Sequence, residues 1–308
     1  MESFDRSVRK RMEIADKLIL GHNQFFGVNH LSSARGVATE QYFSSTENVI
    51  SLVRTAYRAG VTGLMLSTHE RARAIADALR GDSELSSNLH LHILLPYMAK
   101  YVRMANERGL ISMMEESLNQ ATWAERIAIG LRAGTGVVTK DLLAILAALI
   151  EIELLPFKGL NVQSVFLHNS LTDMVAALRA TEVVRFFVKN IEEKHGACPA
   201  FCTLSAGLAM SYFRDIGLEA PVMMAPFNPA GFQMNPSRQR CEQLLQEYPC
   251  HMVAMSVLAA GYVTPADAAR YLSSLAGIDS IVFGASSAGH VTELSNVLGT
   301  VVGQTVTQ

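Results

Sequence analysis

The sequence is poor in several features that would each point to a particular class of protein. Its 308 residues include four cysteines, none of them in a C-x-x-C pair of the zinc or redox type. The formal net charge is −2, and Lys and Arg are spread along the chain without the basic stripe that nucleic acids bind. No run reaches the roughly 20 apolar residues of a membrane span. We therefore expect a cytoplasmic protein with neither a nucleic-acid nor a membrane partner.

What the sequence does contain is material for a large core. Hydrophobic residues make up 49% of the chain and charged residues 18%, a balance typical of a folded globular protein. The length suits one α/β barrel, and no low-complexity linker or internal repeat divides the chain. We predict a single domain over residues 1–308.

Short apolar runs alternate with helical patterns along the chain, which indicates repeated βαβ units around a parallel sheet. Eight runs are found, and eight is the strand number of the (β/α)8 TIM barrel, the fold we predict. The runs are Leu18–Gly21, Gly63–Ser67, Leu89–Leu95, Val162–Leu167, Pro199–Leu204, Pro221–Ala225, His251–Val257 and Ser280–Phe283.

Capping residues set the bounds of the predicted helices. Thr264 followed by Pro265 is a hydroxyl N-cap with a first-turn proline, typical of a helix start. Glycines mark helix ends. The other helices predicted in this way are Glu70–Leu79 closed by Gly81, Asp173–Lys194 closed by Gly196, Pro236–Gln246 closed by Pro249, and an apolar, core-facing helix over Leu142–Leu155.

In a barrel of this kind the residues that follow each strand converge on one opening, so candidate catalytic groups are sought there. His168 directly follows the apolar run VQSVFL, and a neutral imidazole there can donate a hydrogen bond or relay a proton. His69 and Glu70 follow the second strand. Tyr97 and Lys100 follow the third and form a candidate Tyr/Lys pair beside His168.

The last strand leads into a helix through Gly284, Ser286 and Ser287, and free N–H groups at a helix start bind anions. The expected ligand is a small molecule, anionic or phosphorylated, with NAD(P)H as the candidate cofactor. Candidate cofactor contacts at other strand ends are Asn169, Asn228 and Ser256. An ordinary capped turn would explain the same residues.

A second interpretation is a divalent metal site. His22, His69 and His168 follow different strands, and histidines from separate strand ends can ligate one metal ion. His90 and His92 lie within a predicted strand, where a structural role is favoured.

Four segments resemble the aldo-keto reductases. VFLHNSLTD is similar to the family's fourth-strand motif, which ends in an active-site His, and PFNPAG to its sixth-strand segment. AMSVLAAGYVTP resembles the seventh-strand motif, and IVFGASSAGHVTELSNVL resembles the final strand and helix that hold the cofactor phosphate. The resemblance runs loosely from Leu18 to Leu298.

The resemblance implies a barrel that binds NADP(H) and reduces carbonyls with an Asp, Tyr, Lys and His tetrad. His168 fills the His position and Asn169 follows it. The family's Asp, Tyr and Lys positions fall near Met65, within 69–71 and within 94–96, where none of the three residue types occurs. Because Ser286–His290 also lacks Lys and Arg, a preference for the 2′-phosphate of NADPH is not expected.

Three functions remain open on these observations. The first is an atypical NAD(P)(H)-dependent oxidoreductase acting on a small carbonyl or alcohol. The second is a non-redox lyase, hydrolase or isomerase, either assisted by a metal or using His69 and Glu70 as acid and base. The third is a ligand-binding pseudoenzyme, which the density of polar strand-end residues argues against.

Overall fold

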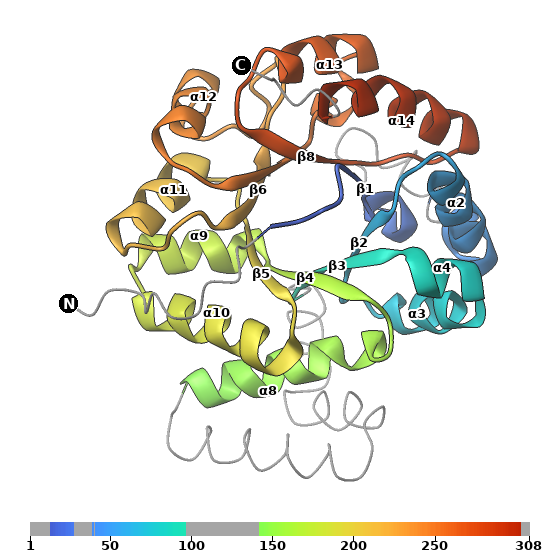
Figure 1. Cartoon of the computed structure of the whole chain (residues 1–308), viewed down its shortest axis with the longest axis horizontal. Helices are drawn as coiled ribbons and strands as arrows, with labels where there is room; N and C mark the ends of the chain where they lie inside the picture. The colour runs from blue at the N-terminus through green and yellow to red at the C-terminus, as the bar shows by residue number, and fades with distance from the viewer. Residues whose placement is uncertain (1–12, 28–38, 40, 97–141, 303–308) are drawn as a thin grey trace.

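The computed structural model describes residues 13–27, 39, 41–96 and 142–302. Within these ranges eight parallel strands close into a barrel in chain order, and β8 pairs with β1 to complete the ring (Figure 1). Leu20 lies opposite Phe283 at this closure. The predicted (β/α)8 fold is confirmed.

The strands agree closely with the predicted apolar runs. Gly63–Ser67 and Val162–Leu167 have the predicted bounds, whereas Ile278–Phe283 begins two residues before the predicted start. The polar Asp279 interrupts the apolar run there, so the predicted strand starts after it. In the structure its carboxylate accepts a hydrogen bond from the backbone N–H of Met252 at 2.9 Å. The strands are β1 (Leu18–Leu20), β2 (Gly63–Ser67), β3 (His90–Leu95), β4 (Val162–Leu167), β5 (Cys198–Cys202), β6 (Val222–Pro226), β7 (His251–Met255) and β8 (Ile278–Phe283).

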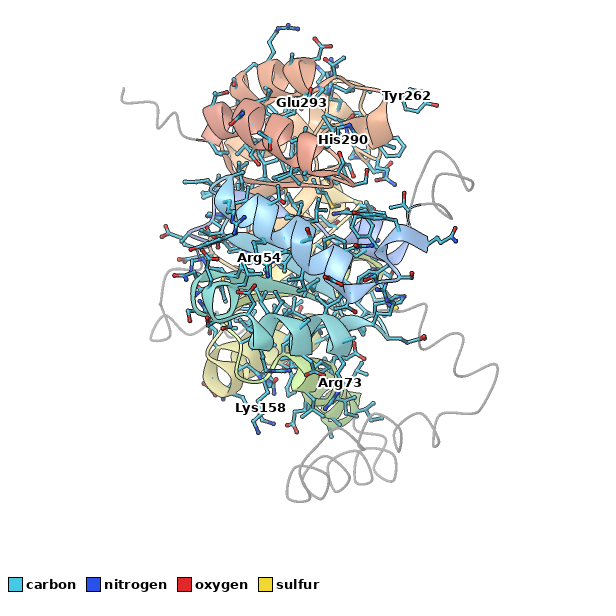
Figure 2. The ribbon with its side chains drawn as sticks, turned by 90° about the vertical axis from the view of Figure 1, so that its right-hand side faces the viewer. Arg54, Arg73, Lys158, Tyr262, His290 and Glu293 are labelled. Carbon is cyan, nitrogen blue, oxygen red and sulfur yellow. The ribbon has the colours of Figure 1, made fainter. Side chains whose placement is uncertain are left out.

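Helices surround the barrel, and Figure 2 shows α14, α2 and α3 side by side along one flank. The helices are α2 (Thr46–Arg58), α3 (Ala72–Gly81), α4 (Ser83–Asn88), α8 (Leu142–Leu154), α9 (Asn169–Ala177), α10 (Thr181–His195), α11 (Ala206–Asp215), α12 (Arg238–Glu247), α13 (Pro265–Ser273) and α14 (Ala288–Val302), with short 3-10 turns η1 (Asn23–Phe26), η2 (Leu155–Phe157) and η3 (Ala259–Gly261). No helix in these described ranges is long and apolar enough to cross a membrane.

Local signals explain several helix bounds. The Thr264 hydroxyl accepts a hydrogen bond from the backbone N–H of Asp267 at 3.2 Å, so the predicted N-cap of α13 is confirmed. Gly196 closes α10 with φ +62°, also as predicted. The apolar helix α8 buries Ile150 completely, which confirms a core-facing helix.

Two helix predictions were wrong. The segment predicted as one helix over Asp173–Lys194 forms two helices, α9 and α10, separated by a turn in which Arg179 has φ +52°. Gly81 is the last residue of α3 and not a stop beyond it. The next helix instead begins after Asp82, whose carboxylate accepts a hydrogen bond from the backbone N–H of Leu85 at 3.0 Å.

The core has two layers. One lies between the barrel and its helices, and the other fills the barrel, where Met65, Phe166 and Val253 pack together. Apolar residues face both sides of these strands, as parallel sheets covered on both faces require. The barrel interior is therefore packed, and chemistry is confined to its ends.

Polar residues close the end of the barrel where the strands begin. The Asp16 carboxylate contacts Nδ1 of His90 at 2.9 Å and Nε2 of His92 at 3.1 Å, and it accepts a hydrogen bond from Thr62 at 2.5 Å. Nδ1 of His92 bonds the Ser164 hydroxyl at 2.7 Å. Because His92 is fully buried, we assign the two strand-three histidines to a structural network at this end.

Candidate functional site

The opposite end of the barrel, which we call the mouth, gathers the residues that follow each strand. Side chains alternate along a strand, so Ser67 shares with Met65 the face that points into the barrel, and His168 continues the inward face of Phe166. His22 follows β1 after Gly21. The mouth thus receives polar groups from β1, β2 and β4.

His168 caps helix α9. Its Nδ1 accepts a hydrogen bond from the backbone N–H of Ser170 at 3.3 Å, and the backbone N–H of His168 donates to the Leu95 carbonyl at 2.8 Å. Burial lowers the pKa of His168 below its ordinary value, so the ring is neutral near pH 7. Because Nδ1 acts as an acceptor, the proton of the neutral ring sits on Nε2. His168 is therefore built to offer an N–H donor.

The rings of His22 and His69 both contact the ring of Phe26. The Phe26 ring stacks on His69 with centroids 4.2 Å apart and 14° between the planes, and it contacts the His22 ring at 5.5 Å. His69 Nδ1 accepts a hydrogen bond from the backbone N–H of Arg71 at 3.2 Å. The stack fixes the ring of His69, which β2 places at the mouth.

The Arg71 side chain connects three segments of the chain beside His69. Its guanidinium donates to the carbonyl of Phe25 at 2.8 Å, to that of Ser44 at 3.0 Å and to that of Phe43. One side chain thus joins the loop after β1 and the segment before α2 to the loop after β2. This role was missed in the sequence because the carbonyls that Arg71 binds are distant in the chain.

His22 is the most perturbed imidazole of the mouth. It is 8% exposed, and burial, followed by the nearby His168 and His69, lowers its pKa to about 3. A hydrogen bond to the backbone of Met65 opposes that shift. His22 is therefore neutral at every physiological pH.

Asp173 supports the neighbouring part of the mouth. Its carboxylate accepts hydrogen bonds from the Thr203 hydroxyl and from the backbone N–H of Leu204, the latter at 3.2 Å. Burial raises the pKa of Asp173, which these bonds partly offset. Burial also raises the pKa of the inward-facing Cys202 thiol to about 12, so this cysteine is no nucleophile. Asp173 was missed because its partners follow a different strand.

Of the three remaining catalytic candidates, the structure describes only Glu70. Glu70 is exposed in the turn that precedes α3, on the rim of the mouth. Tyr97 and Lys100 lie outside the described residues.

The candidate cofactor residues fall into two groups. Gly284, Ser286 and Ser287 are exposed where β8 leads into α14, whose first turn carries no acidic residue. Ser287 accepts a hydrogen bond from the backbone N–H of His290 at 3.3 Å and so caps α14. The positive end of α14 is thus open to an anion. These residues suit a phosphate group.

The second group consists of Asn228, Ser256 and Asn169, and the first two make hydrogen bonds with other residues of the protein. Asn228 is fully buried, and its amide bonds both the carbonyl of Phe232 at 2.9 Å and its N–H at 2.8 Å, so it shapes its own loop. The Ser256 hydroxyl bonds Gln233 at 3.4 Å. Asn169 is partly buried at the first position of α9.

The metal interpretation finds no support in the geometry. His22, His69 and His168 are all described, yet no three His, Cys, Asp or Glu side chains within the described ranges are arranged to hold a metal ion. The rings of His22 and His69 instead each contact the Phe26 ring. We therefore correct the expectation of a three-histidine metal site.

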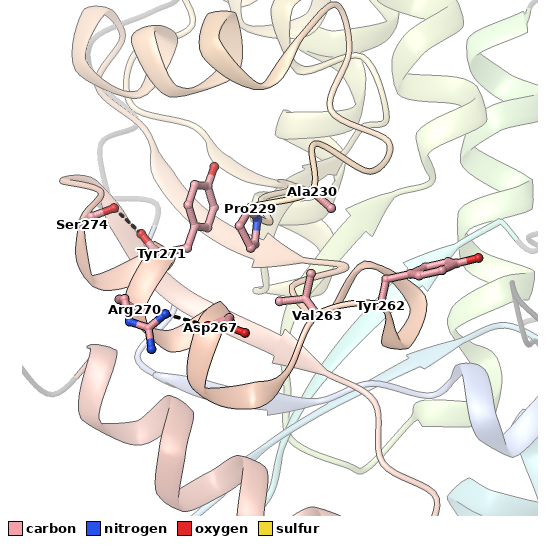
Figure 3. Close-up of a pocket in the computed structure, with 8 residues that line it drawn as sticks. All are labelled: Pro229, Ala230, Tyr262, Val263, Asp267, Arg270, Tyr271 and Ser274. Carbon is pink, nitrogen blue, oxygen red and sulfur yellow. Dashed lines mark hydrogen bonds and ion pairs between the residues drawn. The ribbon is translucent and has the colours of Figure 1, made fainter.

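A surface pocket of about 610 Å³ lies between the loops after β6 and β7 and the helix α13 (Figure 3). Figure 3 shows Pro229 near the Tyr271 ring, while the Tyr262 ring projects away. Tyr271 donates to Glu242 at 2.8 Å, and Arg270 pairs with Asp267 at 2.6 Å. Arg270 and Asp267 thus pair within the pocket, whereas the Tyr271 hydroxyl bonds a residue outside its lining.

Comparisons with known proteins agree with the fold. No family model matches the chain, and no curated protein matches it. Two solved structures of candidate aldo-keto reductases from Pseudomonas aeruginosa are similar to it, with TM-scores of 0.59 and 0.57. Their identities are 11% and 10%, and each alignment covers 95% of this chain and 93% of the other. At such identity the likeness establishes a shared barrel fold, the one that the resemblance in the sequence implied.

Proposed function

We propose that this chain is an atypical NAD(P)(H)-dependent oxidoreductase of aldo-keto reductase type, acting on a small carbonyl or alcohol at the barrel mouth. The observation that carries the proposal is His168, a neutral imidazole at the end of β4 whose Nδ1 is engaged and whose Nε2 carries the proton. The shared barrel fold and the phosphate-compatible start of α14 support it.

His168 would act on the reacting oxygen. A carbonyl oxygen accepts hydrogen bonds, and the Nε2–H of His168 is a donor held in place by the bond between Nδ1 and Ser170. Such a bond polarises the carbonyl and stabilises the negative charge that develops on its oxygen during reduction. Because His168 is neutral, it acts first as a hydrogen-bond donor and not as a cation.

The residues at the start of α14 would hold the phosphates of the nucleotide. A Cβ at Gly284 would lie 3.1 Å from Oε1 of Gln24, so a glycine here allows the chain to pass close to the loop after β1. Ser286 and Ser287 are exposed beside the backbone N–H groups of the first turn. A bound nicotinamide nucleotide would supply the hydride, and solvent would supply the proton that completes the product alcohol.

The absence of Lys and Arg from Ser286–His290 leaves no cation in this segment for a 2′-phosphate. The protein would then use NADH at least as readily as NADPH.

Transfer of a deuterium label tests this function directly. The purified chain is incubated with nicotinamide nucleotide deuterated at the transferable position and with a panel of small aldehydes and ketones, and the products are analysed by mass spectrometry. Label on the carbon of a product alcohol is the expected result. Consumption of a carbonyl compound without label in its product would refute the redox assignment, as would the absence of any labelled product across the panel.

A further inference from the structure

The surface pocket of Figure 3 has an exposed tyrosine on its rim. Tyr262 belongs to the lining of this pocket, yet its ring is directed away from it and the residue is 77% exposed. Among the described residues no other large apolar or aromatic residue is more exposed. A ring held in water beside an empty apolar hollow leaves two surfaces whose burial would be favourable. Such a surface is typical of a binding site for another molecule.

The loop after β7 holds Tyr262 in this outward position. Ala259 and Ala260, which shortly precede it, have φ +46° and +59°, a left-handed conformation that residues with a side chain rarely adopt. The backbone N–H of Val263, directly after Tyr262, donates to the Leu258 carbonyl at 3.1 Å. Tyr262 is therefore presented by a closed turn with an unfavourable backbone conformation, which a role for the exposed ring would explain.

A chain of polar contacts connects the walls of the pocket. The Tyr271 hydroxyl donates to Glu242 at 2.8 Å, and Glu242 also pairs with Nε of Arg238 at 3.3 Å. Arg238 in turn donates to the carbonyl of Pro229 at 2.5 Å. These contacts join α13, α12 and the loop after β6, so the hollow between Pro229 and Tyr271 is already formed in the free chain. A preformed pocket loses little freedom when it binds a partner.

The chemistry of the lining suits a tyrosine side chain. Pro229, Val263 and Tyr271 offer apolar and aromatic surface to a ring. Asp267 and Arg270 also line the pocket, pair at 2.6 Å, and offer an acceptor and a donor to a hydroxyl. A phenol side chain can use both kinds of surface, since its ring is apolar and its tip is polar.

We propose that two copies of this chain form a two-fold symmetric dimer in which Tyr262 of each copy inserts into the pocket of the other. A two-fold axis brings the same surface of both copies together, so a ring and a hollow that share one surface each meet their counterpart. The exposed pair of Arg270 and Asp267 carries no net charge, so the two surfaces do not repel each other. Neither nucleotide nor substrate takes part, and the inference is independent of the proposed function.

Sedimentation velocity of the purified chain measures the association. The contact centres on one ring and one pocket in each copy, which is small for a protein interface, so we expect a weak dimer with a Kd of about 10 µM. The chain should then sediment mainly as a monomer at about 1 µM and mainly as a dimer at about 100 µM.

Substitutions of the exposed ring test its part in the contact. Tyr262→Ala removes the ring and should raise the Kd at least about tenfold, as is usual for an aromatic residue at the centre of an interface. Tyr262→Phe keeps the ring and should raise the Kd by less. Tyr42 is 57% exposed on another segment, so Tyr42→Ala is the matched control and should leave the Kd unchanged. The Tm of all three variants should stay near that of the wild type, because both positions are exposed.

A second variant blocks the pocket and leaves the ring in place. Ala230 lines the pocket and is exposed, so Ala230→Trp should fill the hollow and weaken association as Tyr262→Ala does. In an equimolar mixture of the two variants, Tyr262 of the Ala230→Trp protein can enter the intact pocket of the Tyr262→Ala protein. One of the two contacts is thereby restored, and the mixture should contain more dimer than either variant alone.

Three results would overturn the proposal. The first is a wild-type chain that stays monomeric at about 100 µM, tenfold above the expected Kd. The second is a dimer that persists unchanged in Tyr262→Ala, which would place the interface on another surface. The third is a mixture of the two folded variants that shows no recovery of dimer, because Tyr262 and the pocket would then not meet between copies.

Discussion

At the scale of single residues, His168 combines a structural role with the chemical role that we propose, and substitutions can separate the two. Its Nδ1 caps α9 through the backbone N–H of Ser170, and we propose that its Nε2–H binds the reacting oxygen. His168→Asn retains an acceptor for the cap and removes the Nε2–H donor. We expect kcat/KM to fall by about 10²–10⁴-fold with little change in Tm.

His168→Ala is the matched comparison for this prediction. It removes both functions, so it should lose the same activity and in addition about 1 kcal/mol of stability from the missing cap. Steady-state kinetics and thermal denaturation of the two variants provide the measurements. Retention of near wild-type kcat/KM by His168→Asn would exclude His168 as a catalytic residue.

Asp16 links the stability of the barrel to pH. Burial raises its pKa, but the hydrogen bonds with His92, Thr62 and His90 outweigh burial, and the net pKa lies below the ordinary value. A carboxylate with a lowered pKa contributes stability that is present above its unfolded pKa of about 3.9 and is lost as the pH falls through the folded pKa.

The Tm should therefore drop on acidification below about pH 4, and Asp16→Asn should be less stable at neutral pH and show a smaller acid-dependent drop. Thermal unfolding of both proteins across this range provides the check. Parallel Tm profiles for the two proteins would be inconsistent with an ionised Asp16 that stabilises the fold.

Residues of the site differ in how far the sequence predicts them. His168 is predicted because it directly follows a buried apolar run, and strand alternation then turns it inward. Arg71 and Asp173 cannot be recognised in this way. Their partners, such as the carbonyl of Phe25 and the hydroxyl of Thr203, meet them only when the barrel closes. The lowered pKa of His22 likewise depends on burial and on the nearby His168 and His69, which only the folded chain provides.

At the scale of elements, two glycines with similar sequence context should respond oppositely to alanine. Gly196 has φ +62° after α10, so Gly196→Ala forces a left-handed alanine and should cost about 1 kcal/mol. Gly81 lies in α3, and a Cβ there meets nothing within 4 Å. Gly81→Ala should stabilise the protein by about 0.5–1 kcal/mol.

Chemical denaturation of both variants measures these changes. A stabilised Gly196→Ala or a destabilised Gly81→Ala would contradict the assigned helix ends.

The strands were predictable because strands covered on both faces form uninterrupted apolar runs, and turn residues bound them. The break between α9 and α10 could not be predicted from the sequence. The residues around it, Ala177–Ala180, include neither Gly nor Pro, and the turn is made by Arg179 in a left-handed conformation that non-glycine residues rarely adopt. Arg179 pairs with Asp215 at 3.1 Å and lies over the Tyr212 ring at 5.5 Å, contacts that only the folded chain provides.

At the scale of the whole molecule, the closed barrel brings a donor imidazole and a phosphate-compatible helix start to one end. His168 supplies the donor, and the start of α14 supplies the second feature. The opposite end is closed by the network around Asp16. A single domain over residues 1–308 stays a prediction, since residues 97–141 lie outside the described ranges.

The central claim is that the barrel binds a nicotinamide nucleotide, and titration of the purified protein with NADH, NADPH and inorganic phosphate by thermal shift tests it most directly. A nucleotide that binds only the folded chain should add about 2.7 kcal/mol at a hundredfold excess over its Kd. We predict clear stabilisation by NADH, at least equal to that by NADPH. A Tm that stays unchanged up to the highest concentration of either nucleotide that the assay allows would contradict the oxidoreductase assignment.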